Sequence, residues 1–372
     1  MVTVTMRDER LRPRGQIRCT KISTVIRKNM PHTFSLDISP EDLGKARRIK
    51  KGWGIIIEED GLTISGSLTS FKESSSKGII SRTISGISDL VMARDRLTLP
   101  DPASVTDQQK KSYYTYKGPA ETAIKDLVYL NAGEGALQDR RTFGLQIAPN
   151  LGRGAGVAIN TRHKNLLDEV KNAADTGGLV LSCAQSSTNN TIIFDVKPGR
   201  DLSRPIRLTV GADEVLGYDT SQTHAEATTV IVGGQGEGAA RNLQEVSNGT
   251  GWGGRRIEVF KDRRDTNEDT NLVADAESEL AEKAEEVKLT FDLQESPARK
   301  FGKNFTIGDT ITVELEHGVT FVEQVTSAQI TWDKNIRSVT LTVGNTDDDK
   351  VTTAEQKKIS LLSSQILHLQ TI

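Results

Sequence analysis

Alternation of apolar and polar residues marks the first hundred residues of the chain. Residues 33–38 read TFSLDI, residues 78–86 alternate in the same way, and residues 53–58 form a short apolar run before an Asp-Gly turn. A period of two between glycine and aspartate turns is typical of short β-strands. Residues 1–98 are therefore predicted to form an N-terminal β-barrel or sandwich domain.

Helical periodicity replaces alternation in the middle of the chain. Pro119 and Glu121 are suited to the start of a helix that runs to residue 131. A second helix is predicted to start near Asn160 or Thr161 and to end at Gly177-Gly178, and the stretches 179–184 and 191–196 follow as strands. Residues 108–198 are thus predicted to form an α+β insert domain, and the proline- and aspartate-rich residues 99–107 a linker.

Strand patterns return after residue 198. Residues 199–295 are predicted to form a second β-rich domain with an amphipathic helix over 270–288, whose opposite face is acidic. Residues 296–372 are predicted to form a C-terminal β module and a terminal helix, which either stands alone or packs with 199–295 as one barrel. The apolar stripe of that terminal helix would be Ile359, Leu362, Ile366 and Leu369. The predicted fold is α+β, strand-rich and multidomain: two small β-barrel or sandwich domains, an α+β insert, and a C-terminal β module plus helix.

Length and composition agree with a folded, multidomain protein. The chain has 372 residues, of which 35% are hydrophobic and 26% charged, and a net charge of −2. This balance does not indicate a strongly basic nucleic-acid binder. No apolar run approaches 18 residues, and the first ten residues lack the apolar core of a secretion signal. We therefore expect no membrane segment and synthesis in a cytosol.

Positive charge is concentrated near the N-terminus. The basic residues are Arg7, Arg10, Arg12, Arg14, Arg18 and the run RRIKK at 47–51. They form either a solvated surface or a docking face for an acidic neighbour.

Local patterns of catalytic residues are absent from the sequence. It contains no G-x-S-x-G elbow and no H-E-x-x-H helix, and its five histidines are scattered singly. Cys19 and Cys183 are far apart and lie in strand-like patterns, which favours burial over a disulfide or a metal site. We predict no catalytic residue, no metal and no enzyme activity. The alternative is a hydrolase whose carboxylates come from distant parts of the chain.

A glycine cluster directly follows a short β-branched stretch at 228–232. Gly233, Gly234, Gly236 and Gly238 make a G-x-G pattern, which is one part of a dinucleotide-binding fingerprint. That fingerprint also requires a helix that begins at the glycines, whereas residues 239–251 have no helical pattern. The preferred interpretation is a glycine-rich turn at a barrel corner or a subunit contact, with no cofactor. Nucleotide binding through Gly233–Gly238 is the alternative.

Several motifs, in order along most of the chain, resemble the tail-tip hub family of long-tailed bacteriophages and prophages. This is the siphovirus tail protein family, which is similar to the N-terminal hub of tail-associated lysins. The motifs are RKN at 27–29, FSLDI at 34–38, RTISG at 82–86, VIVGGQGEG at 230–238, WGGRRIE at 252–258, DRRD at 262–265 and GDTITV at 308–313.

The resemblance implies a structural hub rather than an enzyme. In that family, two β-barrel domains from each of three chains make a pseudo-sixfold ring that joins the tail tube to the tip. The implied partners are two further copies, the distal tail or tail tube protein, the tape-measure protein and further tip or receptor-binding proteins, with DNA only as passing cargo. The implied location is the virion tail tip, after assembly in the bacterial host cytoplasm.

The resemblance also guides the choice of residues for assembly. Many relatives continue into a cell-wall hydrolase or a receptor-binding fibre, and this sequence ends at Ile372, so we do not carry cell-wall cleavage over from the family. A tail-associated cell-wall hydrolase is the alternative function. The candidate interface residues are Gly234, Gly236, Arg241, Trp252, Arg255 and Arg256.

Overall fold

The computed structural model describes residues 2–264, 269–334 and 336–344. It is 46% strand and 19% helix, which confirms the predicted strand-rich α+β class. The predicted terminal helix with Ile359, Leu362, Ile366 and Leu369 lies outside the described residues.

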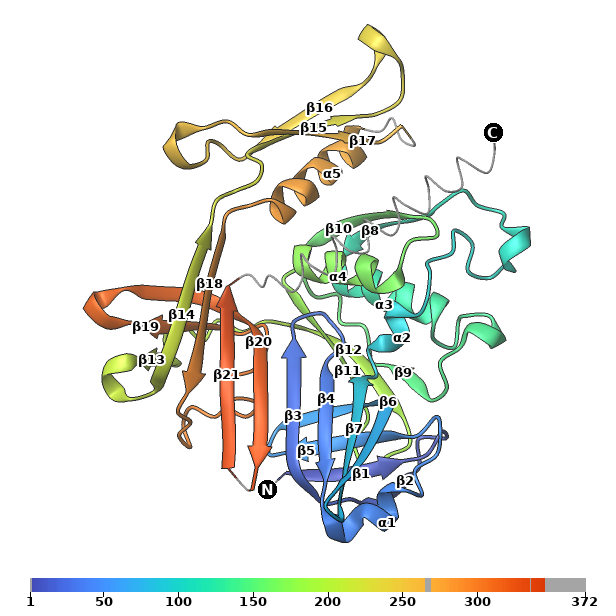
Figure 1. Cartoon of the computed structure of the whole chain (residues 1–372). Coiled ribbons are helices and arrows are strands. Elements are labelled where there is room, and N and C mark those ends of the chain that lie inside the picture. Colours follow the sequence, from blue (N-terminus) through green and yellow to red (C-terminus); the bar gives the residue numbers. More distant parts are fainter. Residues whose placement is uncertain (1, 265–268, 335, 345–372) are drawn as a thin grey trace.

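One sheet of 13 strands connects the two ends of the described chain (Figure 1). Its strands are β1 (Thr3–Arg7), β2 (Pro13–Gln16), β3 (Cys19–Arg27), β4 (Thr33–Ile38), β5 (Gly54–Glu59), β6 (Leu62–Ser76), β7 (Ile79–Ser88), β13 (Arg207–Thr209), β14 (Val215–Thr223), β18 (Glu286–Leu293), β19 (Thr310–Glu314), β20 (Thr320–Asp333) and β21 (Ile336–Gly344). The order is β14-β18-β21-β20-β3-β4-β7-β6-β5-β1-β2, and β19 pairs with β20 and β13. In the part of the chain that is described, the sheet is curved but does not close into a barrel.

Antiparallel pairing of β20 with β3 makes this sheet continuous, since it joins the C-terminal strands to the N-terminal ones. Beyond this junction, β5 and β1 fold back on one side and β19 and β13 on the other. The buried side chains form a single cluster that includes Leu36, Ile57 and Ile84 together with Ile311, Ile330 and Leu341. One hydrophobic core therefore takes residues from the predicted N-terminal, second and C-terminal regions.

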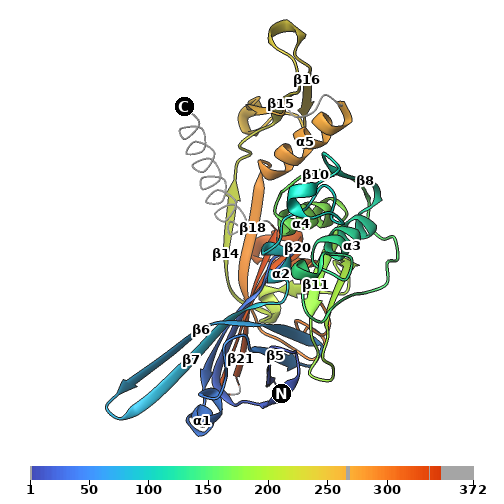
Figure 2. The same ribbon diagram turned by 90° about the vertical axis from the view of Figure 1, so that its right-hand side faces the viewer.

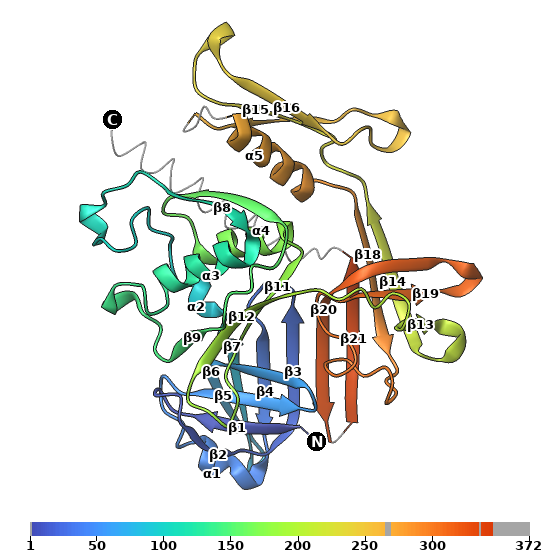
Figure 3. The same ribbon diagram turned by 180° about the vertical axis from the view of Figure 1, so that it is seen from behind.

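The insert has its own core and its own short sheets. Its elements are α2 (Val91–Arg94), β8 (Tyr114–Pro119), α3 (Ala120–Asn131), β9 (Leu145–Ile147), β10 (Gly156–Thr161), α4 (Leu166–Thr176), β11 (Leu179–Ala184) and β12 (Ile192–Pro198). Helices α3 and α4 pack on each other through Ile124, Leu127, Leu166 and Val170, all fully buried. The insert lies against the main sheet on the side of β11 and β12 (Figure 3).

Two predictions within this region were wrong. The second helix begins at Leu166 rather than near residue 160, because residues 156–161 form β10 and pair with β8. Asn165 caps the helix by accepting hydrogen bonds from the backbone N–H groups of Leu167 and Asp168. The stretch 99–107 is not a free linker, since Leu99 is buried and its N–H donates to Asn131.

A small distal module stands on strands β14 and β18, above the rest of the molecule in Figure 1. It consists of β15 (Thr229–Gly233), β16 (Leu243–Ser247), β17 (Glu258–Asp262) and α5 (Asp269–Glu282). The helix packs on one face of the three strands, where Val230, Val232, Leu272, Ala276 and Leu280 form a third core. The predicted helix over 270–288 is too long, because the chain leaves it after Glu282 to pair as β18 with β14 and β21.

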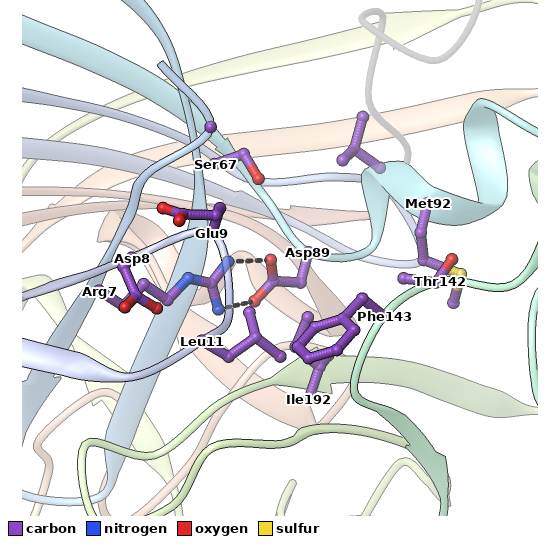
Figure 4. Close-up of a pocket in the computed structure, with 12 residues that line it drawn as sticks. Arg7, Asp8, Glu9, Leu11, Ser67, Asp89, Met92, Thr142, Phe143 and Ile192 are labelled. Atoms are coloured by element: carbon purple, nitrogen blue, oxygen red, sulfur yellow. Dashed lines mark hydrogen bonds and ion pairs between the residues drawn. The ribbon is translucent and has the colours of Figure 1, made fainter. Parts of the chain in front are cut away.

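A buried ion pair lies where the main sheet meets the insert (Figure 4). Arg7 on β1 is 2% exposed and makes a bidentate pair with Asp89, which follows β7. The same guanidinium donates to Oε1 of Gln185 at 2.8 Å, and Asp89 also accepts from Ser65. Arg7 is therefore a structural residue and does not belong to the predicted basic docking face.

Two other arginines of the predicted docking face are also paired. Arg14 donates to Asp8 and Arg18 to Asp42, and both carboxylates are buried. The hydrogen bonds from Arg18 hold the pKa of Asp42 well below its usual range. These pairs reduce the net positive charge that the N-terminal sequence would otherwise present.

We predict that Asp89→Asn lowers the free energy of unfolding by about 3–5 kcal/mol, because it leaves the Arg7 guanidinium buried without its counter-charge. The measurement is urea unfolding. Arg207→Ala is the matched control, since the Arg207–Glu314 pair is exposed, and it should change stability by less than about 1 kcal/mol. Equal effects of the two substitutions would contradict this role of Arg7.

We also predict a pH dependence that originates at His32. Burial, together with the charge of Arg27, lowers the pKa of His32 to about 4. The unfolded chain, with an ordinary histidine pKa of about 6.5, then binds more protons between pH 4 and 6.5. Stability from this residue is complete above pH 6.5 and is lost as the pH falls towards 4, by at most about 3 kcal/mol. The free energy of unfolding of His32→Gln should therefore fall less between pH 6.5 and pH 4 than that of the wild type. Equal falls in the two proteins would contradict this role of His32.

Candidate assembly interface

Short hydroxyl side chains line one face of the main sheet. Across β21, β20, β3, β4, β7 and β6, the directly paired residues of one lateral row are Ser338, Thr331, Ser23, Ser35, Ser85 and Ser70. We call this surface, which continues onto β18 at Thr290 and onto β14 at Asp219, the hydroxyl face. Its strands lie side by side in Figure 1, where β21, β20, β3 and β4 cross the middle of the molecule.

The two faces of these strands differ sharply in burial. On β4, Phe34, Leu36 and Ile38 point into the core, whereas Thr33, Ser35 and Asp37 are only partly buried. Side chains of the polar side hydrogen-bond one another across strands: Thr83 donates to Asp37 at 2.7 Å and Thr340 to Asp292 at 2.6 Å. The hydroxyl face is therefore an ordered polar surface, backed by a complete hydrophobic core.

The glycine cluster forms the turn between β15 and β16, which are antiparallel. Gly236 has a φ of +100°, and a Cβ there would lie 2.6 Å from the carbonyl oxygen of Ala240. The glycine is needed for the turn itself. Since an antiparallel strand follows the glycines in place of a long helix, the turn lacks the geometry of a dinucleotide site.

Arg241 is bound within the distal module. Its guanidinium donates to the carbonyl oxygens of Gly233 and Gly234, pairs with Asp262, and lies 5.2 Å from the ring centroid of Phe260. The side chain is 14% exposed. These contacts give Arg241 a role in holding the glycine turn against β17.

Trp252, Arg255 and Arg256 lie in the exposed loop between β16 and β17. The indole of Trp252 stacks edge-on against His224 and donates to Glu285 at 3.1 Å, yet remains 49% exposed. Arg256 pairs with Glu245 and Glu258. The register places this loop at the Thr229 end of β15 and the glycine turn at the Gly233 end. The six predicted interface residues thus form two groups at opposite ends of one strand.

A cavity of about 180 Å³ lies beside the Arg7–Asp89 pair (Figure 4). It is lined by β1, the segment after β7 and the loop that carries Thr142 and Phe143. The Arg7 guanidinium points to Asp89 and is occupied by it and by Gln185. Within the described residues, no group of three or more His, Cys, Asp or Glu side chains is arranged to hold a metal ion.

No helix among the described residues is long and apolar enough to cross a membrane. Both cysteines are free thiols.

The sequence analysis missed the hydroxyl face because its row joins Ser23 to Thr331, residues that only the β20–β3 pairing brings together. The available signal was the alternation of Ser and Thr with apolar residues in each strand.

The overall architecture is similar to that of several solved phage tail proteins. The chain is similar in structure to the prophage MuSo2 43 kDa tail protein from Shewanella oneidensis, with a TM-score of 0.57 at 13% identity over 92% of this chain and 97% of that one. A tail protein from Neisseria meningitidis MC58 gives a TM-score of 0.57 at 14% identity over 92% and 96%. Prophage tail protein gp18 from Listeria monocytogenes EGD-e gives 0.53 at 13% identity over 96% and 99%.

Residues 3–345 match the family model of the Siphovirus ReqiPepy6 Gp37-like proteins, and the chain belongs to that family. A comparison with curated proteins found no match. The predicted resemblance to siphovirus tail proteins is confirmed. Membership of this siphovirus tail protein family implies that the chain is a component of the virion.

We predict that Arg241→Ala opens the glycine turn locally, at a cost of about 1–3 kcal/mol, because two carbonyl oxygens and Asp262 lose a charged donor. Hydrogen exchange should become faster in β15 and β16 and stay unchanged in β3 and β4. Arg256→Ala, which removes only exposed ion pairs, is the control and should leave exchange in β15 nearly unchanged. Similar exchange rates in both variants would show that Arg241 does not hold the turn.

Proposed function

We propose that this tail protein is the hub of a long-tailed phage tail tip, where three copies form a ring that joins the tail tube to the distal tip. The hydroxyl face would line the central opening, through which the tape-measure protein and DNA pass. The protein would act by its geometry and would have no enzymatic role. The observation that carries this proposal is the hydroxyl face itself, a broad polar surface on an otherwise well-packed sheet.

The arrangement of strands supports a ring with pseudo-sixfold symmetry. The strands that carry the hydroxyl face fall into two antiparallel groups of four, β3-β4-β7-β6 and β20-β21-β18-β14, which meet at the β20–β3 pair. Each group has further strands folded behind it over the shared core. Three copies would supply six such groups, so the junction inside each chain would alternate with a junction between chains.

The chemistry of the hydroxyl face suits a passage. The serine and threonine residues carry no charge and have short side chains that hold water. The face also carries charges of both signs: Lys21 stands between Asp37 and Asp333 in the strand register, and Lys72 lies near its outer edge. Several of these hydroxyls also bond to a neighbour on the same face, for example Thr290 to Thr342 at 3.2 Å. The uncharged central row of this surface would hold a passing acidic polymer or an extended protein chain only weakly.

The insert and the distal module would then lie away from the opening and meet other tail proteins. The candidates are the distal tail or tail tube protein on one side and further tip or receptor-binding proteins on the other. The exposed loop with Trp252, Arg255 and Arg256, which lies beside the ends of β14 and β18, is the proposed contact because its tryptophan is half-exposed.

The proposal predicts where a heavy-atom label will appear in the assembled protein. Ser35→Cys, labelled with a gold cluster on its thiol, should show density inside the central opening in electron micrographs of the oligomer. Lys197→Cys is the control, because Lys197 is exposed on the insert and should give density outside the ring. Density outside the ring for Ser35→Cys, or inside for both variants, would contradict the proposed lumen.

A further inference from the structure

The eight strands that carry the hydroxyl face end in two free edges. At one end of this group is β14, whose only partner among the described strands is β18. At the other is the outer part of β6. Of its 15 residues, the first six pair with β5 and the N–H of Leu68 still donates to the carbonyl oxygen of Trp53, whereas the residues from Thr69 to Ser76 have β7 as their only neighbouring strand among the described residues. Figure 2 shows this part of the β6–β7 hairpin extending away from the body of the molecule.

We propose that these two edges are the surfaces through which copies of this chain join: the outer part of β6 in one copy pairs with β14 of the next. This inference rests on the proposed ring and names the residues that close it. Strand β14 has nine residues, so the two free edges are similar in length.

The order of the strands sets the direction of this pairing. All seven neighbouring pairs from β14 to β6 are antiparallel. With eight strands in alternation, β14 and β6 run in opposite directions. When copies are related by rotation about a ring axis, β6 of one copy therefore meets β14 of the next in antiparallel orientation. Three copies of eight strands would close a barrel of 24 strands with no edge left open.

The side chains of the two edges are complementary on both faces. Within one chain, Lys72 of β6 pairs with Thr83 and Asp219 of β14 pairs with Thr290, and both threonines lie on the hydroxyl face. Lys72 of one copy would therefore stand near Asp219 of the next copy on that face. On the core side, Phe71 is 42% exposed and Tyr218 is 40% exposed. Pairing would bring a cation to an anion and cover both aromatic rings.

The remaining end of the long sheet shows how an edge looks when it is protected. Strand β2 is only four residues long and contains Pro13 and Arg14, which discourage pairing with another strand. Strand β14 has neither lysine, arginine nor proline, and it exposes Leu216 at 63%. An unprotected edge of this length is expected to be covered in the assembled protein.

Disulfide trapping tests the pairing in the full chain. Lys72→Cys with Asp219→Cys in one chain should form, with oxidised glutathione, covalent oligomers on a non-reducing gel that end at three linked copies, because opposed strand residues lie within disulfide distance. Two further pairs test registers displaced by two residues in either direction: Ser70→Cys with Asp219→Cys, and Ser74→Cys with Asp219→Cys. Each single variant, and Lys72→Cys with Gln16→Cys on β2, should remain unlinked.

Light scattering on the same samples separates this inference from the ring itself. A trimeric mass with linkage by one of the three cysteine pairs supports the proposed junction. A trimeric mass without linkage by any of the three pairs overturns the junction and leaves the ring intact. A monomeric mass at all concentrations, without linkage, contradicts the ring and the junction together.

Discussion

The antiparallel pairing of β20 with β3 is the interaction on which the rest of the structure depends. It joins strands that are about 300 positions apart in the sequence and makes one sheet and one core from the two ends of the described chain. Without it, Ser23 and Thr331 would belong to separate surfaces and the hydroxyl face would be divided. Arg7, held by its ion pair with Asp89, then contacts the insert through Gln185, and β14 and β18 carry the distal module.

This organisation separates the hydroxyl face of the main sheet from the insert and the distal module. The main sheet combines a dense apolar core with a polar face of small side chains, a combination that favours rigidity and weak adhesion together. The insert and the distal module have cores of their own, so their loops can differ without disturbing the sheet. A tail protein that must surround a passage and also contact several partners would benefit from such a division.

Local patterns in the sequence predicted local structure well and long-range structure poorly. The strict alternation at 33–38 became β4, and the helix from Pro119 to residue 131 became α3 with almost the same bounds. The start of α4 and the end of α5 were misplaced because strand pairing, with β8 and with β14 and β21, decided which residues left the helix. The burial of Arg7 could not be predicted, since its partner Asp89 is 82 residues away. The resemblance to tail proteins identified the family, whereas the hydroxyl face required the register between distant strands.

Cryo-electron microscopy of the purified oligomer is the most direct test of the central claim, that the hydroxyl face lines the opening of a ring. The account predicts a closed threefold ring in which β18, β21, β20, β3, β4 and β7 of each copy face the central opening with Ser35 and Thr331 at its wall. A map in which this face packs against a neighbouring chain or points to the outside would contradict the account, even if the oligomer were threefold.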